Sequence, residues 1–155
     1  MATTSRTADK QVRLLGLVSI IIGAVMIIAG AVTWGMVSTK LAAENITVSA
    51  DAPMFGGAKV TGPLEAFVQA DVINTHALKA TGGKTYAELD KEDPLRATAM
   101  NGSFLRASLF TSVVSFGIAA LVMGLGVLFI LVGYALRVLS SKDAVVATPV
   151  AAPVV

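Results

Sequence analysis

The sequence predicts a mainly α membrane protein. Two transmembrane helices form an antiparallel hairpin, and a small mixed α/β extracytoplasmic domain is inserted between them. Of the 155 residues, 55% are hydrophobic and only 14% are charged, whereas a typical soluble domain has about 25% charged residues. Residues 14–39 and 107–136 contain no charged side chain. Each run exceeds the roughly 20 residues that a helix needs to cross the hydrocarbon core of a bilayer.

The two charge-free runs divide the chain into five parts. We expect an N-terminal tail, a first transmembrane helix, the inserted domain, a second transmembrane helix and a C-terminal tail, at residues 1–13, 14–38, 39–105, 106–137 and 138–155. A cleaved signal peptide ending at Ala43 is the alternative for the first helix. Because the hydrophobic region of a signal peptide is only about 7–15 residues long, a retained anchor is the favoured interpretation.

Lysine and arginine side chains near the spans predict the orientation. They are denser in the two tails than in the middle segment, where acidic residues balance them. Because basic residues are retained on the cytoplasmic side of a membrane, we expect both tails in the cytoplasm and the middle segment outside the membrane. Pro149 and Pro153 near the C-terminus predict an extended end.

The inserted domain is predicted to begin with a β-hairpin. Within residues 45–51, Ile46, Val48 and Ala50 alternate with other side chains, as in a short strand, and residues 56–62 could return as its partner. The domain has few large apolar residues. We therefore expect it to rest on the membrane helices or on a partner for its stability.

The rest of the inserted domain contains residues that are typical of helix starts and ends. Pro63 suits the first position of a helix that continues to about residue 81, and Gly82 would end it. Asp93, followed by proline, predicts the start of another helical segment. We expect a break at Gly102 and its preceding asparagine, after which Ser103 caps the second transmembrane helix.

The motif that most resembles a catalytic element is Gly-Gly-Lys-Thr at residues 82–85. A phosphate-binding loop needs a further glycine five residues before the one that precedes the lysine, and Leu78 occupies that position. Thr85 and Glu88 instead fit a capping box at the start of a short helix. The segment therefore predicts helix boundaries, and no nucleotide site is expected.

The sequence lacks the residues that other classes of site require. The chain has one histidine, His76, and no cysteine, whereas zinc and non-haem iron sites use several nitrogen or sulfur ligands. The acidic residues at 88–93 are interleaved with a lysine and are expected to form a solvated, helix-capping face. The net charge of +2 gives no basic surface for nucleic acid. We expect neither a metal nor an organic cofactor.

Small residues recur every seven positions in both predicted membrane helices. Because lipid provides little hydrophobic force between helices, close approach of backbones at small residues drives their packing. The residues expected to pack the helices are Gly16, Ser19, Gly23, Gly30, Ser112, Ser115, Ala119, Gly126 and Gly133. A second set on another face of the second helix, Gly117, Ala120 and Gly124, is expected to face a partner.

Together with this architecture, residues 45–117 resemble a group of small two-span membrane proteins from actinobacteria. The resemblance rests on NITVSAD, VTGP and QADVINTHALKATGGKTYAELDKEDPLRATAMNGSFLRASLFTSVVSFG, and it covers roughly residues 10–137. It implies a membrane location and a hairpin with an external domain. Such proteins are often labelled as aromatic ring-opening dioxygenase subunits. Ring cleavage, however, needs an iron held by two histidines and a carboxylate, and this chain has one histidine.

These observations predict a non-catalytic integral membrane protein, an accessory or structural subunit that docks onto a larger respiratory or cell-envelope complex. Its expected partners are the lipid bilayer and the integral membrane proteins of that complex. Neither charge-free run has the Asp, Glu, Lys, Arg or His residues that transporters use. The alternative is a self-assembling homo-oligomer, such as a small channel, whose polar lining would be Ser19, Thr33, Ser112 and Ser115.

Overall fold

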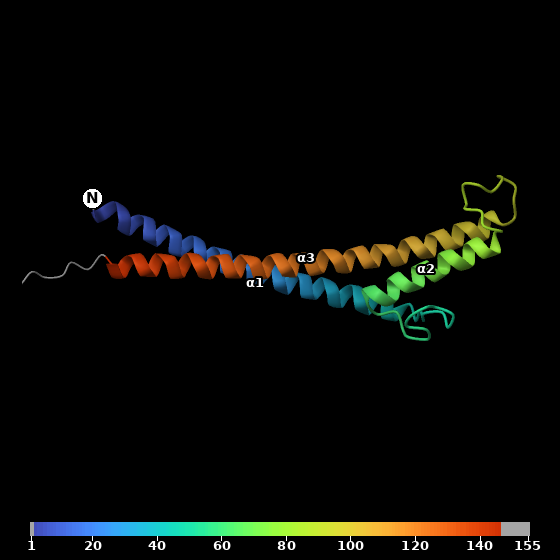
Figure 1. Cartoon of the computed structure of the whole chain (residues 1–155), viewed down its shortest axis with the longest axis horizontal. Coiled ribbons are helices and arrows are strands. Elements are labelled where there is room, and N and C mark those ends of the chain that lie inside the picture. Colours follow the sequence, from blue (N-terminus) through green and yellow to red (C-terminus); the bar gives the residue numbers. More distant parts are fainter. Residues whose placement is uncertain (1, 147–155) are drawn as a thin grey trace, which may run out of the picture. The chain divides into compact units, whose positions relative to one another are not determined.

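The computed structural model describes the backbone of residues 2–146 and the side chains of residues 9–140 (Figure 1). The described chain forms three helices, α1 (Ala2–Ala43), α2 (Pro63–Ala80) and α3 (Arg96–Val146). The prediction of a mainly helical fold is confirmed. The predicted extended end at Pro149 and Pro153 lies outside the described residues.

Helices α1 and α3 are both long and apolar enough to cross a membrane. In the most apolar 18-residue stretch of each helix, only 17% of the residues are buried. The core helix of a soluble protein would instead be mostly buried. Length, apolar composition and exposure together suit a lipid environment.

Both long helices extend beyond the predicted spans. α1 includes residues 2–13, and α3 begins at Arg96. The predicted break at Gly102 is therefore wrong. A glycine inside a helix costs only about 1 kcal/mol relative to alanine, and here it has a packing role. A Cβ atom added to Gly102 would lie 2.7 Å from the Cβ of Ala77 on α2.

The described chain separates into two compact units. Among the described residues, one comprises 2–31 and 121–146, and the other comprises 32–120. In the first, α1 and α3 approach closely at two pairs of glycines, Gly16 with Gly133 and Gly23 with Gly126.

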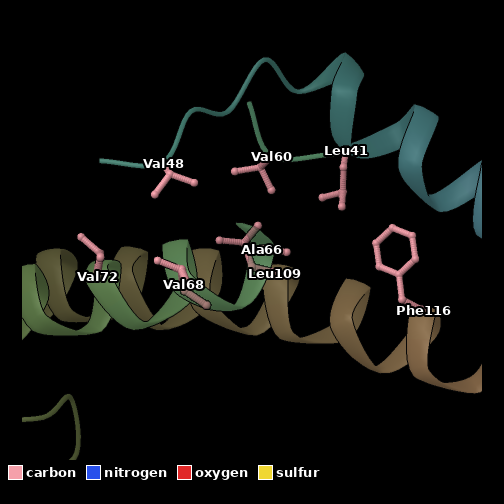
Figure 2. Close-up of a cluster of buried hydrophobic side chains, with 9 residues drawn as sticks. Leu41, Val48, Val60, Ala66, Val68, Val72, Leu109 and Phe116 are labelled. Carbon is pink, nitrogen blue, oxygen red and sulfur yellow. The ribbon is translucent and has the colours of Figure 1, made fainter. Parts of the chain in front are cut away.

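The second unit has an apolar core to which all three helices contribute (Figure 2). Leu41 comes from α1, Ala66, Val68, Ala70 and Val72 from α2, Leu109 and Phe116 from α3, and Val48 and Val60 from the connection between α1 and α2. The Trp34 ring packs edge-on against Phe116, with 4.7 Å between centroids. The long helices therefore supply part of the core that the middle segment lacks by itself.

The predicted mixed α/β character of the middle segment is not found in the described residues. Residues 45–51 and 56–62 do run antiparallel, but they form a single bridge between Thr47 and Lys59. Only a few ladder bonds are made, among them Val48 N–H to the carbonyl of Ala58 and Val60 N–H to that of Ile46. An isolated two-stranded hairpin is marginal in water. Here Val48 and Val60 are instead held by burial against α2.

The sequence signals at both ends of α2 are confirmed. Pro63 is in the first turn, after Gly62 at the N-cap. At the other end, Gly82 and Gly83 have positive φ angles of 64° and 85°. Their N–H groups donate to the carbonyls of Lys79 and Leu78. These two bonds form a Schellman motif, which ends a helix by satisfying its last carbonyl groups.

No helix starts at Thr85, and this part of the prediction is wrong. The Glu88 carboxylate accepts both the N–H and the hydroxyl of Thr85, each at 2.7 Å. The N–H of Glu88 does not bond to the Thr85 hydroxyl, as it would in a capping box, but donates to the backbone carbonyl of Thr85. One half of the capping box is therefore present, but it closes a turn.

Candidate binding surfaces

The predicted packing residues of α1 and α3 have distinct surroundings. Gly16, Gly23, Gly30, Ala119, Gly126 and Gly133 are buried, and Ser19, Ser112 and Ser115 are half-buried. A Cβ atom on Gly16 would lie 2.7 Å from the carbonyl oxygen of Gly133, and one on Gly126 would lie 2.6 Å from that of Gly23. Any side chain at these positions would force the two backbones apart.

Hydroxyl groups add hydrogen bonds to this helix contact. Ser19 on α1 donates to the carbonyl of Phe129 on α3 at 2.7 Å, and Ser140 donates to that of Asp9 at 2.9 Å. Hydrogen bonds of this kind between membrane helices are worth about 0.6 kcal/mol on average. Small residues and hydroxyls therefore support the same contact.

The second set of small residues on α3 has no such neighbours. Gly117, Ala120 and Gly124 are exposed, and a Cβ atom on either glycine would meet nothing within 4 Å among the described residues. Exposed large apolar side chains flank them, including Ile118 and Leu121. This face would let another helix approach the α3 backbone closely.

The serines named as a possible channel lining have their hydroxyls engaged. Ser112 donates to the carbonyl of Ser108 and Ser115 to that of Thr111, both within α3. Ser19 donates to Phe129, as described above. In each of these hydroxyls the O–H donor is used by a backbone carbonyl, and the lone pairs of the oxygen remain for water or ions.

A pocket of about 580 Å³ lies in the unit formed by residues 32–120. Its volume falls within the roughly 300–1,000 Å³ typical of small-molecule sites. The walls are mainly apolar, with charged groups at the α1 end and hydroxyls on α3. It is lined by Lys40, Leu41, Glu44, Ile46, Gln69, Ile73, Phe104, Leu105, Ser108, Leu109 and Ser112.

Gln69 is a pocket residue that the sequence analysis did not identify. It is only 8% exposed, and its Oε1 accepts the N–H of Ser49 at 2.9 Å. This bond fixes the orientation of the amide. A polar residue in the middle of the apolar face of α2 was the available signal, because buried polar groups need partners.

His76 and the acidic residues have structural partners outside the pocket. Nε2 of His76 lies 2.7 Å from Oδ2 of Asp51, and this contact lowers the pKa of Asp51 from its usual value. Asp93 accepts the N–H of Leu95 at 2.8 Å. Among the described residues, no group of three or more His, Cys, Asp and Glu side chains is arranged to hold a metal ion.

Residues 82–85 have the surroundings of a helix end. The hydroxyl of Thr81 lies within hydrogen-bond distance of the carbonyls of Ala77 and Leu78, and the glycines that follow end α2. A phosphate-binding loop would follow a strand and open a helix.

No family model, curated protein or solved structure matches this chain.

Proposed function

We propose that the chain is a non-catalytic integral membrane protein that docks, as an accessory or structural subunit, onto a larger respiratory or cell-envelope complex. In this proposal α1 and α3 span the membrane, both termini are cytoplasmic, and residues 39–105 are extracytoplasmic. We also propose that the chain is related to the two-span actinobacterial proteins that it resembles.

The observation that carries the proposal is the open small-residue face of α3. Where glycines pack α1 against α3, each glycine faces the backbone of the other helix, as Gly23 and Gly126 do. Gly117 and Gly124 are also glycines on a long apolar helix, but a Cβ atom added to either would meet no described residue within 4 Å. A membrane helix from another protein would contact the α3 backbone there through van der Waals packing.

The lack of suitable chemistry supports a non-catalytic role. Reaction sites need a nucleophile, base or metal held by a second group. The one histidine of the chain pairs with an exposed carboxylate, Asp51. The runs 14–39 and 107–136 contain no Asp, Glu, Lys, Arg or His, the residues that proton and ion relays within membranes use.

The proposal is tested by affinity purification of the tagged full-length protein from its native membranes in mild detergent. We expect other membrane proteins to co-purify at a fixed stoichiometry and to be lost when Gly117 and Gly124 are both changed to leucine. Gly35→Leu is the matched control, because Gly35 is exposed on α1 with nothing within 4 Å of a Cβ. Recovery of a monomer alone would contradict docking.

The same purification separates the alternative of self-assembly. A homo-oligomer would give a cross-linking ladder of one species, lost in the same double variant. Conductance in liposomes would be needed to support a channel. The intrahelical bonds of Ser112 and Ser115 make a polar pore less favourable than docking.

A further inference from the structure

The pocket in residues 32–120 combines an apolar interior with polar and charged residues at its edge, and we propose that it binds one zwitterionic phospholipid. The proposal goes beyond docking, and it rests on the membrane-spanning arrangement given above.

The depth of the pocket along the helices suits a lipid at the membrane surface. Lys40 is the first charged residue after the charge-free run of α1, and Arg106 is the last before that of α3. At 1.5 Å per residue, Ser112 lies about 9 Å further along α3 than Arg106. The lining therefore extends from the level of the headgroups into the level of the acyl chains.

The apolar part of the pocket suits an acyl chain. Leu41 and Leu109 are buried beneath it, and Ile46 and Ile73 are half-buried. Phe104, at 73% exposure, and Leu105 form its open side on α3. An acyl chain would cover apolar surface that is otherwise exposed where the helix leaves the hydrocarbon region.

One polar side chain, Gln69, lies among the apolar residues of the pocket. Gln69 is more than nine-tenths buried, and its Oε1 is used by Ser49. Gln69 lines the pocket, and no buried side-chain nitrogen or oxygen among the described residues lacks a hydrogen-bond partner. In the proposed complex an ester or phosphate oxygen in the pocket accepts a hydrogen bond from the Gln69 amide N–H, the donor end of this side chain.

The charges at the α1 end suit a headgroup of both signs. Lys40, in the last turn of α1, and Glu44, just after its end, both line the pocket, and neither side chain forms an ion pair with another described residue. The ammonium of Lys40 would bind a lipid phosphate, and the carboxylate of Glu44 would bind a headgroup ammonium. An anionic phospholipid without an ammonium would place its negative phosphate near the Glu44 carboxylate and offer that carboxylate no positive partner.

The test uses the full-length protein in mild detergent, incubated with equal amounts of phosphatidylethanolamine and phosphatidylglycerol and analysed by native mass spectrometry. We expect one phosphatidylethanolamine per chain, in preference to phosphatidylglycerol. Ser108→Phe should fill the pocket from an exposed position and reduce retention about tenfold, which corresponds to about 1.4 kcal/mol. Ser103→Phe is the matched control, because Ser103 is also exposed on α3 but does not line the pocket.

Polar variants test the assigned contacts. Gln69→Leu should reduce retention of the lipid, and Glu44→Gln should remove the preference for phosphatidylethanolamine. Gln69→Leu also removes the acceptor of the Ser49 N–H, and this loss could prevent folding. If Gln69→Leu does not fold, the result for Ser108→Phe decides the test. Equal lipid retention by wild type and Ser108→Phe would overturn the proposal, as would a preference for phosphatidylglycerol.

Membrane fractionation separates this inference from the proposed function. A wild-type chain that is extracted from membranes by carbonate would refute the membrane-spanning arrangement itself. A chain that stays integral but retains no phosphatidylethanolamine would refute the lipid site alone.

Discussion

Three side chains organise the connection between α2 and α3 at the scale of single residues. Thr81 is buried at the end of α2, Glu88 closes the turn at Thr85, and Arg96 reaches back from α3. The guanidinium of Arg96 donates to the carbonyl of Leu89 at 2.7 Å and lies 4.0 Å from the centroid of the Tyr86 ring. These contacts hold the acidic segment in a defined turn structure.

We predict that Arg96→Ala loosens this connection. The variant leaves the carbonyl of Leu89 without its charged donor and removes the cation–π contact with Tyr86. Loss of about 1 kcal/mol corresponds to about fivefold faster exchange of the amide hydrogens that turn bonds protect. Hydrogen–deuterium exchange at Glu88 and Asp93 measures this. Lys91→Ala is the control, and equal exchange in both variants would disprove the role of Arg96.

The pKa of Glu88 is predicted to respond to Thr85. The N–H of Thr85, and then its hydroxyl, hold the pKa of Glu88 below its usual value. Because the pKa is lowered on folding, the stabilisation is present above the unfolded pKa of about 4.3 and is lost as the pH falls through the folded value. Carbon-13 NMR titration of Glu88 should show a higher midpoint in Thr85→Val. An unchanged midpoint would mean that the hydroxyl does not contribute.

At the scale of elements, backbone contact at glycine determines how α1 meets α3 in the unit of residues 2–31 and 121–146. The paired positions are seven residues apart on each helix, Gly16 and Gly23 against Gly133 and Gly126. A seven-residue period keeps one stripe of a helix facing its neighbour in a left-handed crossing. Ser19 lies between the two glycines of α1, and its hydroxyl donates a hydrogen bond to the carbonyl of Phe129 on α3.

Gly23→Leu is predicted to destabilise this helix pair. The new side chain would meet the carbonyl of Gly126 and the side chain of Ile130. Overpacking typically costs about 1–3 kcal/mol. Unfolding in mixed micelles should show this loss for Gly23→Leu, whereas Gly35→Leu should be neutral or stabilising by up to about 1 kcal/mol, because leucine favours a helix more than glycine does. Equal stabilities would show that the glycine contact is not needed.

The orientation in the membrane is a property of the whole molecule, and the absence of cysteine makes it measurable. We predict that a membrane-impermeant maleimide labels Ala87→Cys in intact cells, whereas Gln11→Cys is labelled only after lysis. Both residues are exposed and lie outside the charge-free runs. The opposite pattern would reverse the topology. Loss of Gln11→Cys from the mature protein would show that the first span is cleaved.

The sequence by itself determined the features that depend on neighbouring residues. The two charge-free runs predicted both long apolar helices, and Pro63 and Gly82 predicted the ends of α2. These signals are local, because a helix forms its hydrogen bonds within a few residues of the chain. The length of α3 was misjudged because Gly102 is tolerated through its contact with Ala77, which no local pattern reveals.

Only the tertiary structure decided the features that join distant segments. Residues 45–51 have a strand pattern, but the burial of Val48 and Val60 against α2 holds them with a single bridge to residues 56–62. The pocket likewise depends on Lys40, Gln69 and Ser108 meeting from three helices. Spacing along the chain reports which residues share a face. Which faces meet depends on packing between elements, and that is why Gln69 became a candidate site only in the folded molecule.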